Sequence, residues 1–122
     1  MAVEVFVSYS RQDRERVERL IAALEAQDTQ KLLSFWWDQD NVGGAKWWKT
    51  ILQNIRSSDA FVVCVSDSMA SSTPCKLELE YARDCNRHIL PVLVSNVTHK
   101  TLRKVKLVDT HYDVYTVDEP NA

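Results

Sequence analysis

Strand-like and helix-like patterns of apolar residues alternate along the chain, and this alternation limits the possible folds more than any other feature. The run VEVFVSY, Val3–Tyr9, is rich in β-branched and aromatic residues and is followed by polar ones, so we expect a buried strand there. Apolar residues then recur with helical spacing at Val17, Leu20, Ile21 and Leu24, which predicts a helix with one buried stripe.

The same alternation continues to the C-terminal region. The further expected elements are a strand over 31–37, a loop over 38–45, helices over 46–57 and 73–86, strands over 60–66 and 88–94, a helix or loop over 98–107 and a short strand over 112–117. Within the fourth of these strands, Pro91 removes a backbone donor and indicates an edge or irregular position. Ser72, Thr73 and Pro74 form a helix-start signal in which the threonine can act as the cap. Repeated strand–helix alternation predicts one α/β domain with a parallel sheet and helices on both faces.

Composition excludes several classes of protein. The 122 residues are 45% apolar and 26% charged, as in one globular domain, and the net charge of −2 is spread along the chain, so we expect no nucleic-acid partner. The basic cluster Lys100, Arg103, Lys104 and Lys106 is interpreted as a solvated helix face. No membrane span or secretory signal is visible, and the three cysteines lie in apolar segments, so a cytoplasmic protein without a membrane partner is expected.

Several kinds of site are also disfavoured. The chain has only two glycines, too few for a dinucleotide fingerprint, and it has no phosphate-loop motif. His88, His99 and His111 have no ligand-like spacing, so no metal site is expected. The first strand ends in serine, tyrosine and arginine instead of clustered carboxylates, which argues against a magnesium-dependent phosphoreceiver site.

Ligands of parallel α/β folds bind beyond the carboxyl ends of the strands, so the segments of interest are Ser8–Asp13, Asp38–Trp47 and Ser66–Glu78. In the last of these, Glu78 falls on the apolar stripe of the expected helix over 73–86. The other members of that stripe are Cys75, Leu79, Ala82 and Cys85. A carboxyl group on a buried stripe has to be paired, protonated or used, because burying an unpaired charge is costly. A structural hydrogen bond and a functional role both fit this pattern.

Five segments in order resemble those of a Toll/interleukin-1 receptor (TIR) domain of the prokaryotic type. They are VFVSYSRQD, WWDQDNVGGAKWW, IRSSDAFVVCVSDS, CKLELEYA and ILPVLV. The resemblance implies a flavodoxin-like three-layer sandwich with a five-stranded parallel sheet. It also implies a single TIR domain over 1–118, with 119–122 as a tail or the start of a linker.

For enzymatic members, the resemblance implies cleavage of NAD+ between nicotinamide and ribose, with NAD+ as substrate and no cofactor. The family's catalytic glutamate, three residues after a cysteine, corresponds to Glu78. The implied substrate-binding positions are Tyr9, Arg11, Asp38, Trp47 and Cys75. Pro74 stands where many enzymatic members have tryptophan, which puts catalytic strength in question.

The expected function is therefore an NAD+ glycohydrolase that forms ADP-ribose or a cyclic product, activated by self-association in bacterial immunity. Its expected partners are other TIR domains and a fused sensor or oligomerising domain. The alternative is a non-enzymatic scaffold for TIR–TIR signalling. Helical spacing further places Trp48 on the core stripe, while Trp47 is turned about 100° from it and is expected to meet the ligand.

Overall fold

A computed structural model describes residues 2–37, 45–105 and 115–116 of the chain. The described elements, in chain order, are β1 (Val3–Ser8), the 3-10 helix η1 (Arg11–Asp13), α1 (Arg14–Gln27), β2 (Leu33–Trp36), α2 (Ala45–Ser57), β3 (Ala60–Val65), α3 (Asp67–Ala70), α4 (Thr73–Asp84), β4 (His88–Leu93), α5 (His99–Lys104) and β5 (Tyr115–Thr116). None of the described helices has the length and apolar content that a membrane span requires.

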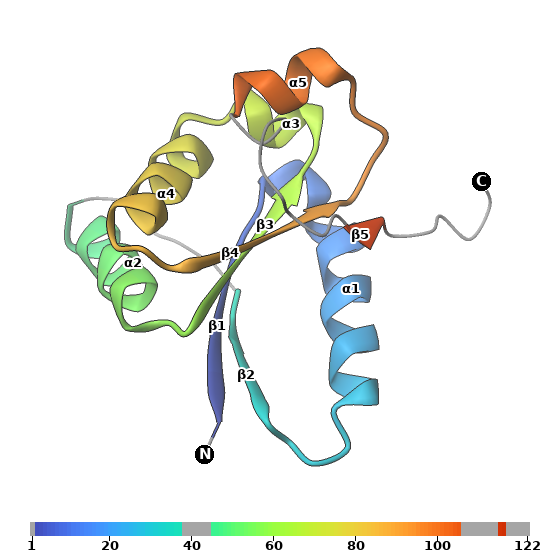
Figure 1. The fold of residues 1–122 in the computed structure, drawn as a ribbon, viewed down its shortest axis with the longest axis vertical. Helices are drawn as coiled ribbons and strands as arrows, with labels where there is room; N and C mark the ends of the chain where they lie inside the picture. Colours follow the sequence, from blue (N-terminus) through green and yellow to red (C-terminus); the bar gives the residue numbers. More distant parts are fainter. Residues whose placement is uncertain (1, 38–44, 106–114, 117–122) are drawn as a thin grey trace.

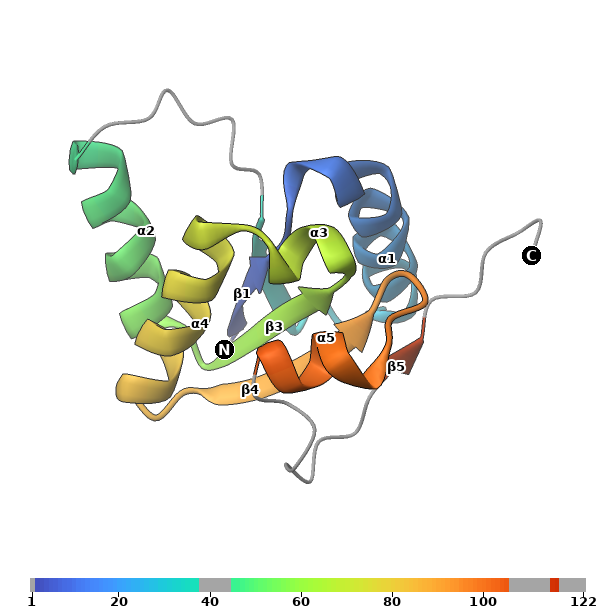
Figure 2. The same cartoon turned by 90° about the horizontal axis from the view of Figure 1, so that it is seen from above.

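The strands form one parallel sheet in the order β2-β1-β3-β4-β5, which is the doubly wound order of flavodoxin-like folds. Helices α2 and α4 cover one face and α1 covers the other, so the sheet is the middle layer (Figures 1 and 2). The predicted α/β fold is confirmed. Four strands have four to six residues, whereas β5 has only two, which pair with Val92 and Leu93.

Two features of the helices differ from the expectation. The short helix α3 was not predicted, because a helix of four residues is too short to show a period. It begins where the Ser66 hydroxyl accepts a hydrogen bond from the Met69 amide at 3.0 Å. The cap of α4 is Ser72 and not Thr73: the Ser72 hydroxyl accepts a hydrogen bond from the Cys75 amide at 3.3 Å, and Thr73 is the first helical residue.

Pro91 lies in β4, which is the second strand from the end of the sheet and not the edge strand. On one side it is paired in register with Val63 of β3. On the other side, within the described residues, β5 reaches only Val92 and Leu93. The missing donor of proline is therefore tolerated beside an incompletely paired side of the strand.

Aromatic rings form a continuous row on the α2–α4 face of the sheet. The ring of Phe6 stacks on Phe61 at 5.4 Å and on Trp36 at 5.0 Å between centroids, and Trp36 meets Trp47 of α2 at 6.0 Å. Each aromatic pair adds specific packing to the apolar area that it buries. The row thus connects β3, β1, β2 and the first turns of α2.

The opposite face of the sheet has its own apolar cluster. Its fully or nearly fully buried members are Val5, Val7, Tyr9, Val17, Leu20, Ile21, Val62, Cys64, Val92 and Val94. Three of them, Val17, Leu20 and Ile21, belong to the predicted stripe of α1, and its fourth member, Leu24, is half-buried. Successive residues of β1 therefore alternate between two separate cores, and this alternation decides which side chains can meet Glu78.

We expect Phe6→Ala to lower the free energy of unfolding by about 3 to 5 kcal/mol, because it removes the central ring of the aromatic row and leaves a cavity. Phe6 is fully buried, with 0% of its surface exposed. Urea unfolding followed by tryptophan fluorescence measures the change. Leu32→Ala, at a site that is 47% exposed, is the control and should change the stability by less than about 0.5 kcal/mol. Equal losses in the two variants would contradict the described packing.

Candidate active site

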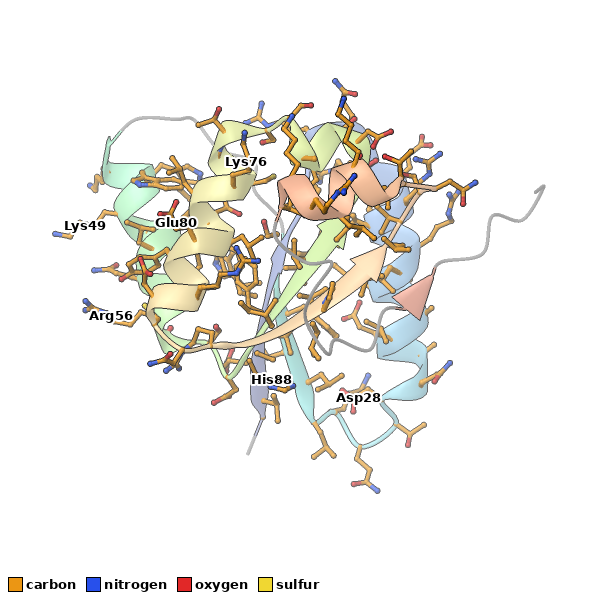
Figure 3. The ribbon with its side chains drawn as sticks, turned by 45° about the horizontal axis from the view of Figure 1, so that its top comes forward. Asp28, Lys49, Arg56, Lys76, Glu80 and His88 are labelled. Carbon is orange, nitrogen blue, oxygen red and sulfur yellow. The ribbon has the colours of Figure 1, made fainter. Side chains whose placement is uncertain are left out.

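The candidate site lies where β1 ends beside the N-terminal half of α4, on the α2–α4 face of the sheet. The stripe predicted for α4 is confirmed: Cys75, Glu78, Leu79 and Ala82 are buried, and only Cys85 is half-buried. Lys76 and Glu80, by contrast, project from the outer side of the same helix (Figure 3). One helix therefore separates a buried carboxyl group from a charged, solvated surface.

Glu78 accepts a hydrogen bond from Ser8. The Ser8 hydroxyl donates to Oε1 of Glu78 at 2.8 Å, with 0% and 3% of the two residues exposed. Ser8 reaches this face because it follows Phe6 by two residues on β1, and alternate residues of a strand point to the same side. Burial raises the pKa of Glu78 to about 7, and the hydrogen bond from Ser8 acts in the opposite direction. Near neutral pH this carboxyl group is therefore divided between its protonated and ionised forms.

Cys75 lies one helical turn before Glu78. Burial raises the pKa of its thiol to about 11, a hydrogen bond with Ser72 opposes the rise, and the charge of Glu78 adds to it. The thiol is therefore protonated at neutral pH, which does not suit a nucleophile. Cys75 is consequently an uncharged, weakly polar neighbour of Glu78.

Asp13 is a second buried carboxyl group at the same end of the sheet. The Ser66 hydroxyl donates a hydrogen bond to it, and Nη1 of Arg16 lies 3.6 Å from Oδ1. Nearby, Ser68 donates to Gln12 at 2.9 Å. These contacts fasten η1 to α3.

Ser8, Asp13 and Ser66 were not predicted as site residues. All three are 3% exposed or less, and they lie at or after the carboxyl ends of β1 and β3. Ser8 lies two residues after Phe6 on the strand, and alternate residues of a strand share a face. This spacing could have predicted the side of the sheet to which Ser8 points. No comparable sequence pattern marked Asp13, because its buried partner, Ser66, comes from a distant part of the chain just after β3.

Tyr9 and Arg11, two of the predicted substrate-binding residues, lie apart from Glu78 in the described structure. Tyr9 belongs to the core on the α1 side, where its ring is 6.3 Å from Trp37. It follows Ser8 by one residue, so strand alternation turns it to the opposite face. Arg11 is exposed on η1 and lines a hollow on the α1 side. Their role in binding substrate stays a prediction.

The two tryptophans of α2 both pack against the core on the α2–α4 face of the sheet. Trp47 was expected to be turned away from the core, yet it packs on Trp36 in the aromatic row, and its Nε1 is buried with no hydrogen-bond partner among the described residues. Trp48, expected on the core stripe, packs against the same core cluster and, like Trp47, is half-buried; it also lines a hollow between α2 and α4. The ring of Trp47 meets Trp36 at the end of β2, a contact between separate elements that helical spacing does not predict. A ligand contact by Trp47 stays a prediction, and Asp38 lies outside the described residues.

Hollows between the helices of the described surface are lined by residues other than Glu78. A hollow of about 490 Å³ lies between α4 and α5, one of about 260 Å³ between α2 and α4, and one of about 410 Å³ beside η1 and α1. Since Glu78 is 3% exposed, it is closed to ligands within this part of the chain. The described residues also contain no cluster of three histidine, cysteine, aspartate or glutamate side chains that could hold a metal ion.

Comparisons with known proteins identify relatives of this fold. The profile of the TIR domain matches residues 5–120. The TIR domain of the Toll-related receptor TRR-2 from Hydra magnipapillata has a TM-score of 0.64 at 20% identity, over 92% of this chain and 82% of that one. The TIR domains of the activated Roq1 resistosome have a TM-score of 0.63 at 22% identity, over 88% of this chain and 68% of that one. The search of curated proteins gives no match.

A further solved structure of this fold is an enzyme that acts on a nucleotide. The CMP N-glycosidase BcmB from Clostridium botulinum has a TM-score of 0.63 at 18% identity, over 92% of this chain and 88% of that one. Identities this low show a shared fold and do not transfer an activity.

We expect Glu78 to make stability depend on pH. Its pKa rises from 4.5 in the unfolded chain to about 7 in the folded one, so between these values the folded protein binds more protons and stability falls as pH increases. Glu78→Gln removes the titration. The stability of the variant relative to wild type should therefore rise by about 3 kcal/mol between pH 4 and pH 8, measured by urea unfolding.

Glu80→Gln is the matched control, because Glu80 lies two residues away on the same helix and is exposed. Its stability relative to wild type should stay nearly constant over the same pH range. A flat difference for Glu78→Gln would show that Glu78 titrates normally and is not buried as described.

Proposed function

The chain belongs to the TIR domain family, and we propose that it is an NAD+ glycohydrolase with Glu78 as the catalytic carboxylate. The observation that carries the proposal is the environment of Glu78, a nearly fully buried glutamate held by Ser8 at the carboxyl end of the sheet, with a pKa of about 7. Strongly shifted carboxyl groups of this kind are typical of active sites. An uncharged side chain could accept the same hydrogen bond from Ser8, so a purely structural role would not require a carboxyl group.

The proposed reaction breaks the bond between C1′ of the ribose and the ring nitrogen of nicotinamide. Both electrons of that bond leave with nicotinamide and neutralise its positive ring, so the leaving group needs no proton. The ribose becomes an oxocarbenium-like cation, which the ionised Glu78 stabilises electrostatically. Water then adds to C1′ and loses a proton to give ADP-ribose, or an adenine nitrogen adds in its place to give a cyclic product.

The fold supports this chemistry by analogy. The structural neighbour from Clostridium botulinum is an N-glycosidase of CMP, and another neighbour, from Leishmania mexicana, is a 2-deoxyribosyltransferase. The latter has a TM-score of 0.60 at 14% identity, over 93% of this chain and 89% of that one. Sites for chemistry at a sugar–base bond thus occur on the same arrangement of strands and helices. NAD+ is the proposed substrate, and no cofactor is part of the proposal.

The proposal includes activation by self-association. Glu78 is closed in the described part of the single chain, so substrate access requires a rearrangement that a neighbouring domain can stabilise. The resistosome neighbour is an assembly that contains TIR domains. We therefore propose other TIR domains as partners, brought together by a sensor or oligomerising domain, in a cytoplasmic effector of bacterial immunity.

The second candidate function is a non-enzymatic scaffold for TIR–TIR contacts. Two observations favour it: Glu78 is only 3% exposed, and the exposed Pro74 occupies the position where the family resemblance implies tryptophan. A scaffold and an enzyme share the same assembly, so only the chemistry distinguishes them.

We expect the protein, when clustered on a multivalent support, to release nicotinamide from NAD+. The products are followed by liquid chromatography, which also separates ADP-ribose from cyclic forms. Glu78→Gln should lower the rate by at least about 100-fold, because an amide cannot offset the positive charge of the transition state. Glu80→Gln, clustered in the same way, should keep the wild-type rate. Release of nicotinamide by Glu78→Gln at the wild-type rate, or none by clustered wild type, would favour the scaffold.

The rate should rise with pH, because the ionised form of Glu78 is the proposed active form. Because kcat/KM follows ionisation of the free enzyme, whose closed form has a Glu78 pKa of about 7, it should increase by up to about tenfold between pH 6 and pH 8, and by less where clustering holds the site open. Ser8→Ala removes the hydrogen bond that lowers the pKa of Glu78, so its profile should shift to higher pH. Ser71→Ala, at an exposed residue after α3, is the control and should leave the profile in place. A falling rate over this range would instead indicate that protonated Glu78 is the active form.

A further inference from the structure

A hollow of about 410 Å³ lies beside η1 and the first turns of α1. It is lined by four arginines, one glutamine and one glutamate: Arg11, Arg14, Arg16, Arg19, Gln12 and Glu15. A net positive lining in a hollow of this size is suited to a small anion, since ligand pockets commonly have volumes of about 300 to 1,000 Å³. No function was predicted from the sequence for this group of arginines as a whole.

Helical spacing brings the arginines together. Arg16 and Arg19 are three residues apart on α1, and Arg11 and Arg14 are three residues apart across the junction with η1. Residues at this spacing are neighbours on a helix surface. The buried stripe of α1 points into the sheet, so the arginines gather on the solvent side without entering the core.

Two of the four side chains are held in place by the surrounding structure. The guanidinium of Arg14 lies 5.7 Å from the ring centroid of Trp37, and its Nε donates to Glu18 at 3.0 Å. Arg16 contacts Asp13, which is buried and accepts a hydrogen bond from Ser66. Side chains that are already positioned lose less conformational entropy when they bind a ligand.

We propose that this hollow binds the diphosphate group of a small ligand at a site separate from Glu78. Arginine is the residue best suited to this chemistry, because its planar fork binds two phosphate oxygens at once. Helix α1 packs on the face of the sheet opposite to α4, so the hollow and Glu78 belong to different layers (Figure 2). Arg11 is also an implied substrate-binding position, so the proposal rests on Arg14, Arg16 and Arg19, which the family resemblance does not assign.

The charge of the chain argues for a small ligand over a nucleic acid. The whole chain has a net charge of −2, so a long polyanion would meet repulsion beyond the hollow, whereas a diphosphate needs only the local charge. The diphosphate can come from free pyrophosphate or from a nucleotide. A purine or pyrimidine attached to it would extend past the arginines toward the neighbouring surface.

Isothermal titration calorimetry at fixed ionic strength, with sodium pyrophosphate and with ADP, tests the proposal. Wild type should bind at least one of them, and the tighter of the two identifies free or nucleotide-linked diphosphate as the source. Arg19→Gln should weaken binding about tenfold. Arg16→Lys should weaken it to a similar extent, because lysine keeps a positive charge beside Asp13 but loses the fork.

Two control variants show whether binding depends on this hollow. Arg56→Gln removes an exposed arginine of α2, away from the hollow, and should bind within about twofold of wild type (Figure 3). Glu78→Gln should also bind like wild type. The proposal is overturned if folded wild type shows no binding at millimolar pyrophosphate. It is also overturned if Arg56→Gln weakens binding as much as Arg19→Gln does, or if only Glu78→Gln changes binding.

Discussion

The hydrogen bond from Ser8 to Glu78 joins strand β1 to helix α4 inside the core, and the properties of the candidate site depend on it. It satisfies one oxygen of a buried carboxyl group but supplies no positive charge. Desolvation therefore dominates, and the pKa of Glu78 rises to about 7 despite the bond. Had a cation occupied the place of Ser8, the carboxylate would be a permanently ionised structural pair, without the ability to change its charge near neutral pH.

Asp13 is a second buried carboxyl group, and it does have a cation beside it. This carboxyl group is as buried as Glu78, with 3% of each residue exposed, yet Asp13 has Arg16 beside it as well as the hydroxyl of Ser66. The two carboxyl groups lie near the same end of the sheet in different electrostatic surroundings. Asp13 is thereby suited to hold η1 and the end of β3 together, because an ion pair with a hydrogen bond fixes geometry. Glu78 is suited to respond to a charge brought by a ligand.

The sequence was sufficient for those features that a repeating pattern encodes. Apolar runs located β1 and β3, and the 3.6-residue period correctly placed Glu78 on the inner side of α4. Features decided by a single residue's direction were less accessible. Tyr9 lies one residue beyond Ser8 and so faces the other core, and Trp47 packs on Trp36 through a contact between separate elements. Sequence spacing describes a helix face, but it does not reveal which neighbouring element that face meets.

Closure and ionisation at Glu78 are coupled under the proposed function. In the closed form, burial favours the protonated carboxyl group, which is uncharged and poorly suited to stabilise a cation. Opening the site admits water and lowers the pKa, and the positively charged nicotinamide ring of NAD+ would lower it further, so substrate binding itself promotes the active carboxylate. A partner domain that stabilises the open form therefore needs to supply no catalytic group, since the charge of Glu78 follows from access. One buried glutamate can thus be silent in a single domain and active in an assembly.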